Sequence, residues 1–152
     1  MSHFQPVDPE FAARIRDSFS RQGAMSHLGA RMTRVEPGEV EVELVYRPEV
    51  TQQHGFFHGG VTGAIADTAG GYAAFTLIAA DATMLTVEYK INLIAPADGE
   101  RLVATGRVVK PGRTLTICEI EVAAVKGGVT TICARGMQTL IRLEGRPDRP
   151  AG

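Results

Sequence analysis

Residues 54–69 have the sequence HGFFHGGVTGAIADTA, which leads from a loop rich in glycine and histidine into the most apolar segment of the chain. One charged residue, Asp67, lies in that segment, and no other residue from Gly59 to Ala80 is ionised at pH 7. Burying a carboxylate in an apolar helix is costly unless the carboxylate is paired or used. We therefore predict a long helix over about residues 59–78, closed by Asp81, with Asp67 as its functional residue.

The rest of the chain supplies strands that can cover this helix. Two strands are expected at 30–35 and 39–46, joined at Glu36-Pro37-Gly38, and alternation or β-branched residues predict four more at 84–94, 101–109, 115–125 and 130–143. The connections between the last three have turn composition, which favours an antiparallel meander. A helix that is apolar on nearly all sides must be covered on nearly all sides. We therefore expect an α+β fold with a curved antiparallel sheet around the helix; any uncovered face would need a second subunit.

The N-terminal region is predicted to form a short amphipathic helix. It starts at Asp8-Pro9-Glu10, with Asp8 as N-cap, and stops near Gly23, ahead of a linker at Met25–Gly29. An apolar stripe supports it: Phe11, Ile15 and Phe19. We expect three segments: an arm with this helix at 1–24, the main domain at 25–144 and a disordered tail at 145–152.

Composition excludes several classes of function. A chain of 152 residues with 44% hydrophobic and 22% charged residues is typical of one globular domain. The net charge of -1 gives no basic footprint for a nucleic-acid partner, and no apolar run has the length of a membrane span. The absence of a signal peptide favours a reducing, cytoplasmic location. There, Cys118 and Cys133 are expected to be inert core residues.

Only small residues surround Asp67 on its helical face at 100° per residue: Gly60, Gly63, Ala64, Gly70, Gly71 and Ala74. Each glycine costs a helix about 1 kcal/mol relative to alanine, so either close packing or an approaching ligand must offset that cost. The backbone N–H groups of Gly59-Gly60 have no intrahelical partner and form a candidate oxyanion site, about 12 Å along the axis from Asp67. This second feature favours a substrate site, with Gln52 placed to polarise a carbonyl or orient a water.

These residues resemble the hotdog-fold thioesterases, specifically the phenylacetate-degradation (PaaI-like) branch. The matching pattern is His58-Gly59-Gly60, six further residues, and then Asp67-Thr68-Ala69, extended by Tyr72-Ala73-Ala74 and by the strand from Thr86 to Pro96. The resemblance covers roughly residues 25–143. It implies the hotdog fold, dimers or homotetramers, acyl-CoA substrates bound at the subunit interface, and no cofactor beyond the CoA of the substrate.

The resemblance also implies roles for individual residues. Asp67 matches the acidic nucleophile or general base, and the Gly59 N–H matches the group that binds the thioester oxygen. His58 matches a loop histidine, for which a structural role as a backbone anchor is an equal alternative. Where some members carry a threonine one turn after the acid, this chain has Gly71, so the role of that hydroxyl is absent or supplied by Thr86. The other expected site residues are Gln52, Gly60, Thr68, Thr86 and Phe57. Arg113 lies in a turn, where it is either a solvated side chain or a contact for the phosphates of CoA.

We expect an acyl-CoA thioesterase for aryl- or medium-chain acyl groups, in which Asp67 attacks the thioester or activates a water. A hotdog enoyl-CoA hydratase or dehydratase is an alternative. Proteins of that type are expected to use a catalytic histidine rather than a single aspartate on the helix, and this helix has no histidine after His58. A non-catalytic acyl-CoA-binding module is another alternative; sensors of that kind usually add a DNA-binding segment, for which the N-terminal arm is too short. No metal is expected, because the loop spacing of His54 and His58 does not place both on one face.

Overall fold

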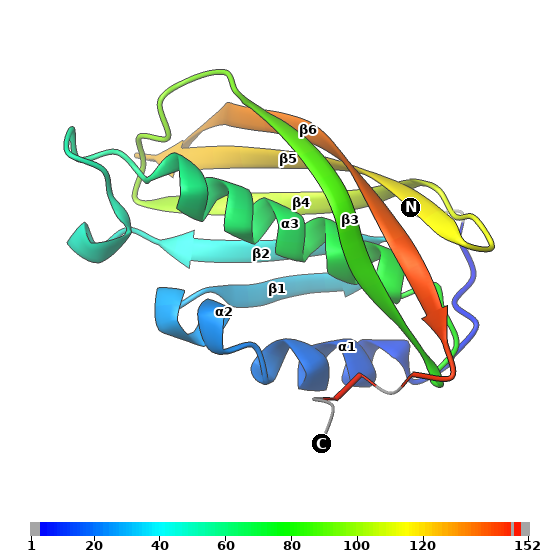
Figure 1. Cartoon of the computed structure of the whole chain (residues 1–152). Helices are drawn as coiled ribbons and strands as arrows, with labels where there is room; N and C mark the ends of the chain where they lie inside the picture. The colour runs from blue at the N-terminus through cyan, green and yellow to red at the C-terminus, as the bar shows by residue number, and fades with distance from the viewer. Residues whose placement is uncertain (1–3, 147, 150–152) are drawn as a thin grey trace.

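The computed structural model describes residues 4–146 and 148–149, and in it one six-stranded antiparallel sheet wraps around helix α3 (Gly59–Phe75) (Figure 1). The expected hotdog fold is therefore confirmed. Across the sheet the strands follow the order β1 (Arg31–Glu36), β2 (Glu39–Val45), β4 (Arg101–Lys110), β5 (Leu115–Lys126), β6 (Val129–Glu144) and β3 (Ala82–Leu93). Parts of the predicted arm and tail, at 1–3, 147 and 150–152, lie outside the described residues.

The strand order explains how the sheet encloses the helix. Strands β4, β5 and β6 are consecutive antiparallel neighbours, as the predicted meander requires. Strand β3 follows α3 in the chain but pairs with β6, at the opposite edge from β1 (Figure 1). The helix therefore contacts both halves of the curved sheet, and β3 is left with one unpaired edge.

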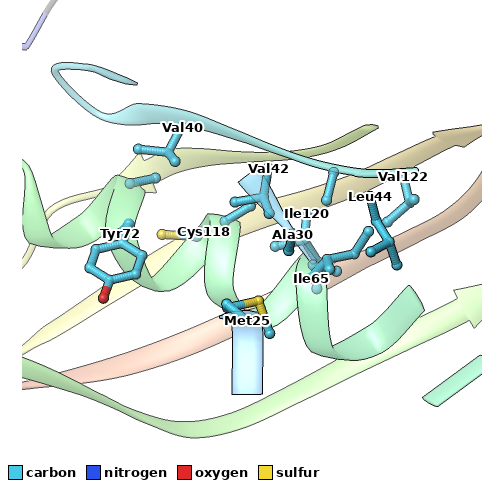
Figure 2. Packing of buried hydrophobic residues seen from close by; sticks show 14 of the residues in the cluster. Met25, Ala30, Val40, Val42, Leu44, Ile65, Tyr72, Cys118, Ile120 and Val122 are labelled. Carbon is cyan, nitrogen blue, oxygen red and sulfur yellow. The ribbon is translucent and has the colours of Figure 1, made fainter. Parts of the chain in front are cut away.

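The core lies between α3 and the inner face of the sheet. Val40, Val42 and Leu44 on β2 are fully buried beside Ile65 of α3, and Figure 2 shows them gathered with residues of β5. On the opposite face of β2 the alternating glutamates are half-buried and form ion pairs with neighbouring strands, such as Glu39 with Arg107 at 3.1 Å. Strand β2 therefore alternates between a core face and a face of paired glutamates with a period of two.

One backbone contact sets the distance between helix and sheet. A Cβ added at Gly106 on β4 would lie 2.3 Å from the backbone nitrogen of Gly70, and a Cβ at Gly70 would lie 1.9 Å from Oε1 of Gln138. Neither position can hold a side chain without displacing its neighbour. Gly70 was expected to clear a path for substrate, but the structure uses it for close helix–sheet packing.

The N-terminal helices differ from two predictions. Helix α1 (Phe11–Ser20) has Glu10 at its N-cap position, and Asp8 instead accepts a hydrogen bond from the Glu10 backbone N–H at 2.9 Å. The predicted linker contains a short helix, α2 (Gly23–Leu28), which begins at the predicted stop and ends at Gly29, whose φ is 75°. A single turn of 3-10 helix, η1, covers Pro48–Val50.

The long helix is also shorter than predicted. It ends at Phe75 rather than near residue 78, and Asp81 does not close it. Thr76 follows the last residue of the helix, and its hydroxyl donates to the carbonyl of Ala73 at 2.6 Å and accepts from the N–H of Gly38 at 2.7 Å. A buried threonine thus ties the end of α3 to the β1–β2 turn. None of the helices in the described part of the chain has the length and apolarity required for a membrane span.

Candidate active site

His58 anchors the beginning of α3. It is the N-cap residue, and its Nδ1 accepts a hydrogen bond from the N–H of Gly60 at 2.9 Å. Its own backbone N–H donates to the carbonyl of Val50 at 2.9 Å. The ring is therefore engaged as a cap, which is the anchoring role that the sequence left as an alternative. The capping bond occupies the Gly60 N–H, whereas the N–H of Gly59 has no partner among the described residues.

Gly59 opens into a cavity of about 400 Å³ at the N-terminal end of the helix. Gln52 lines the same cavity, and its side-chain oxygen accepts a hydrogen bond from the backbone N–H of His54. Phe57 also contributes, although most of its ring is buried against Tyr46 in an edge contact with centroids 5.6 Å apart. The loop thus brings an amide side chain and an unpaired backbone N–H to one place. The other walls are Phe56, Thr62, Cys133 and residues 93–97.

Asp67 is half-buried on α3 and receives two side-chain donors on one oxygen. The hydroxyl of Thr86 donates to Oδ1 at 2.8 Å, and Nε2 of Gln138 donates to the same atom at 2.6 Å. Within the described residues Oδ2 has no such partner. Two donors on one oxygen fix the plane of the carboxylate, which leaves the second oxygen available for chemistry.

Thr86 reaches Asp67 because β3 contains a bulge. Thr86 pairs with Leu140 of β6, but Glu88 pairs with the next residue, Thr139, so Val87 is an extra residue in the ladder. Strict alternation would place Thr86 and Tyr89 on opposite faces of the strand. The bulge instead directs both toward α3: Thr86 to Asp67, and Tyr89 to Gly63, where its hydroxyl would lie 3.5 Å from an added Cβ.

Gln138 is a site residue that the sequence reasoning missed. It lies on β6, is 1% exposed, and bonds to both Asp67 and Thr86. A signal was present: Gly136, Gln138 and Leu140 follow one another on the same face of the strand, so a polar amide occupies an otherwise apolar row. The sequence does not indicate which residue of α3 this amide contacts, because that contact depends on how β6 curves over the helix.

The second cavity, of about 510 Å³, begins at Asp67. Thr68 and Gly71 of α3 line it, as do Met84 and Thr86 of β3. Its far side is formed by the N-terminal helices, where the Tyr72 hydroxyl lies 3.0 Å from Oγ of Ser18 and 3.1 Å from Nε2 of Gln22. Burial raises the pKa of Tyr72, so the phenol stays neutral and serves as a polar end to the cavity.

The sequence predicts one site for Gly59 and Asp67, but within a single chain the structure places them apart. Gly59 and Asp67 line different cavities, and none found in the described part of the chain contains both. Arg113 is exposed at the β4–β5 turn and lines neither of these two cavities. Among the residues described, no group of three or more histidine, cysteine, aspartate or glutamate side chains is arranged to hold a metal ion.

Comparison with known proteins gives the family context for this geometry. The model of the thioesterase superfamily matches residues 54–131, which include both the His58 cap and Asp67. A crystal structure of a thioesterase family protein from Silicibacter pomeroyi superposes with a TM-score of 0.87 at 45% identity, covering 89% of this chain and 99% of that one.

Two curated relatives are 27% identical. One is a 1,4-dihydroxy-2-naphthoyl-CoA hydrolase of Listeria monocytogenes, with 66% of this chain and 81% of that protein aligned. The other is the proofreading thioesterase EntH of Klebsiella pneumoniae, with 86% of this chain and 96% of that protein aligned.

Proposed function

This chain belongs to the thioesterase superfamily, and we propose that it hydrolyses aryl- or medium-chain acyl-CoA thioesters with Asp67 as the reacting carboxylate. The observation that carries the proposal is the state of that carboxylate, which two donors hold through Oδ1 at the mouth of a large cavity. A relative that hydrolyses 1,4-dihydroxy-2-naphthoyl-CoA supports an aromatic acyl group.

The chemistry requires one nucleophile and one oxyanion site. Oδ2 of Asp67 either takes a proton from a water that adds to the thioester carbon, or adds to that carbon itself. In both routes the carbon–sulfur bond breaks, CoA leaves as the thiol, and water supplies the second oxygen of the product acid. The free N–H of Gly59 is suited to stabilise the negative charge on the carbonyl oxygen.

We propose that a second copy of the chain completes the site. Gly59 and Asp67 line separate cavities within one chain, so each cavity holds half of the required groups. Strand β3 has an unpaired edge in the described part of the chain, and it carries four apolar side chains that are 45–57% exposed: Leu85, Val87, Tyr89 and Leu93. Pairing of two copies along β3 covers this surface and brings Gly59 of one copy toward Asp67 of the other.

The cavity next to Asp67 suits the acyl group. Its volume of about 510 Å³ falls in the range of small-molecule sites, and its walls include apolar side chains from four elements: Met25, Phe75, Met84 and Leu140. Gln52 and Thr68 are the further residues that we assign to substrate placement. Arg113 remains a candidate for the CoA phosphates, contributed across the assembly.

The direct test is the Asp67→Asn variant in a free-thiol assay over aryl, short-chain and medium-chain acyl-CoA esters. Loss of the nucleophile or base is expected to reduce kcat by about 10³-fold with little change in KM. A parent rate in Asp67→Asn on a good substrate would exclude the proposal. Hydration of an enoyl-CoA without thiol release would instead support a hydratase, and tight binding without turnover would support a binding module.

A further inference from the structure

Gln138 combines deep burial with an incomplete set of hydrogen bonds. Its side chain is 1% exposed, and Nε2 lies 2.6 Å from Oδ1 of Asp67, 3.1 Å from the carbonyl oxygen of Asp67 and 2.9 Å from Oγ1 of Thr86. Its Oε1 is buried without a hydrogen-bond partner among the described residues. A buried unpaired acceptor reduces stability, so a methionine of similar shape would pack at lower cost.

The chemistry of the neighbours determines which way the amide points. The reverse orientation would put the amide oxygen 2.6 Å from a carboxylate oxygen and 3.1 Å from a carbonyl oxygen, all of them acceptors. The absence of a side chain at Gly70 provides the space for Oε1, because a Cβ there would lie 1.9 Å from it. The packing of α3 against β6 therefore orients the Gln138 amide so that its N–H group faces Asp67.

We propose that Gln138 is a positioning residue for the reacting carboxylate, an inference that rests on the proposed function. Together with Thr86 it holds Oδ1 from two directions, so that Oδ2 alone is presented to the cavity. The two donors prevent rotation of the carboxylate about its terminal bond. Gln138 itself does not contact substrate, because it lies behind Asp67, between α3 and β6.

The proposal predicts a specific change in the pH dependence of activity. In Gln138→Glu, a second carboxyl group would lie where Nε2 now bonds to Asp67. Two carboxyl groups at so short a distance share one proton. The acid limb of the kcat/KM profile should then move to higher pH by about one unit or more. The other titratable groups near this position are Tyr72 and Asp148, which line the cavity at Asp67, and the partners of Gln138 on the two adjoining strands, Cys118 of β5 and Tyr89 of β3. Those groups are unchanged in the variant.

The test compares Gln138→Met and Gln138→Glu with the parent, with Asp67→Asn and with Thr116→Val, a control that removes another buried polar group from the same sheet. We expect Gln138→Met to fold with an unchanged or higher Tm, to keep KM, and to lose about 10- to 100-fold in kcat, the effect of one hydrogen bond to a charged group. Thr116→Val should keep the parent kcat and pH profile.

The outcomes separate this inference from the proposed function. A folded Gln138→Met with the parent kcat, together with an unmoved acid limb in Gln138→Glu, would overturn the positioning role even if Asp67→Asn is inactive. A lower Tm with unchanged kinetics would reduce Gln138 to a packing residue and overturn the role as well. Absence of thiol release by the parent on every ester would reject the proposed function, and the positioning role with it.

Discussion

The hydroxyl of Thr86 on β3 donates to Oδ1 of Asp67 on α3 over 2.8 Å, and the two residues are brought together by the extra residue Val87 in the strand. Replacing Thr86 with valine keeps the shape of the side chain and removes the donor. Loss of one hydrogen bond to a charged group corresponds to about 1.5–3 kcal/mol, so kcat should fall about 10- to 100-fold in the thiol-release assay. Thr139→Val is the matched control, because the Thr139 hydroxyl bonds to Glu88 instead, and it should be fully active.

The contact between Gly70 and Gly106 predicts a large loss of stability. In Gly106→Ala the new Cβ meets backbone atoms of α3 at 2.3 to 2.5 Å, and backbone cannot move aside as a flexible side chain can. Overpacking of this kind should lower the free energy of unfolding by about 3 kcal/mol, measured by urea denaturation. Gly23→Ala has nothing within 4 Å of the added atom and should be neutral or slightly stabilising. Equal stability of the two variants would contradict this packing.

The cavity beside Asp67 should be the determinant of acyl size. Gly71 lines it, and an added Cβ there meets only Leu140 at 3.8 Å, so a leucine side chain would extend into the open space. We expect Gly71→Leu to lower kcat/KM for a phenyl-substituted acyl-CoA by at least about tenfold relative to acetyl-CoA, as expected for loss of a few methylene-sized contacts. An unchanged ratio between the two esters would place the acyl group elsewhere.

The exposed edge of β3 should mediate self-association. Val87→Glu introduces a charge among the exposed apolar residues of the edge strand β3, whereas Val129→Glu introduces the same charge at a residue of β6 that is 66% exposed. Charges at the centre of an interface are strongly disfavoured. Sedimentation velocity should show a shift toward monomer for Val87→Glu only, with loss of thiol release because the site is then incomplete. A monomeric parent with full activity would refute the shared site.

The two cysteines should be unreactive in the folded protein. Burial raises the pKa of the Cys118 thiol to about 12 and also raises the pKa of Cys133, and only the thiolate reacts with a disulfide reagent. At pH 8 we expect no titratable thiol in the native state and two after unfolding. A raised folded pKa also means that stability falls as the pH rises above 9, where the unfolded thiol ionises and the folded thiol does not. Rapid native labelling would contradict the burial of these strands.

Much of the fold followed from local patterns, because those patterns reflect burial directly. The alternation of Val40, Val42 and Leu44 with glutamates identified the inner face of β2, and the charge-poor run after Gly59 identified the central helix. What local patterns did not contain was the pairing between distant segments. The contact of Gly70 with Gly106 depends on where β4 crosses the helix, and the sequence alone cannot distinguish a glycine that admits a ligand from one that admits a strand.

The candidate site divides in the same way. Asp67 and the HGG start of the helix were apparent from residue type and spacing, because a lone carboxylate in an apolar helix is unusual. Gln138 was not, since its role arises from a contact across 71 positions of sequence. The orientation of the Thr86 side chain also depends on the bulge, and the regular alternation of the strand sequence does not indicate that bulge.

The bulge at Val87 also constrains how this protein can change in length. Removing Val87 would restore a regular ladder without exchanging the two faces, because Thr86 and Tyr89 would then stand two positions apart and both would still face α3. Adding one residue would instead leave two unpaired residues in β3 or shift its pairing with β6. The β5–β6 turn at Gly127 and Gly128, by contrast, has open space around both glycines. Changes of length during divergence should therefore be tolerated at that turn and, as a deletion, at Val87, whereas insertions should be eliminated from the middle of β3.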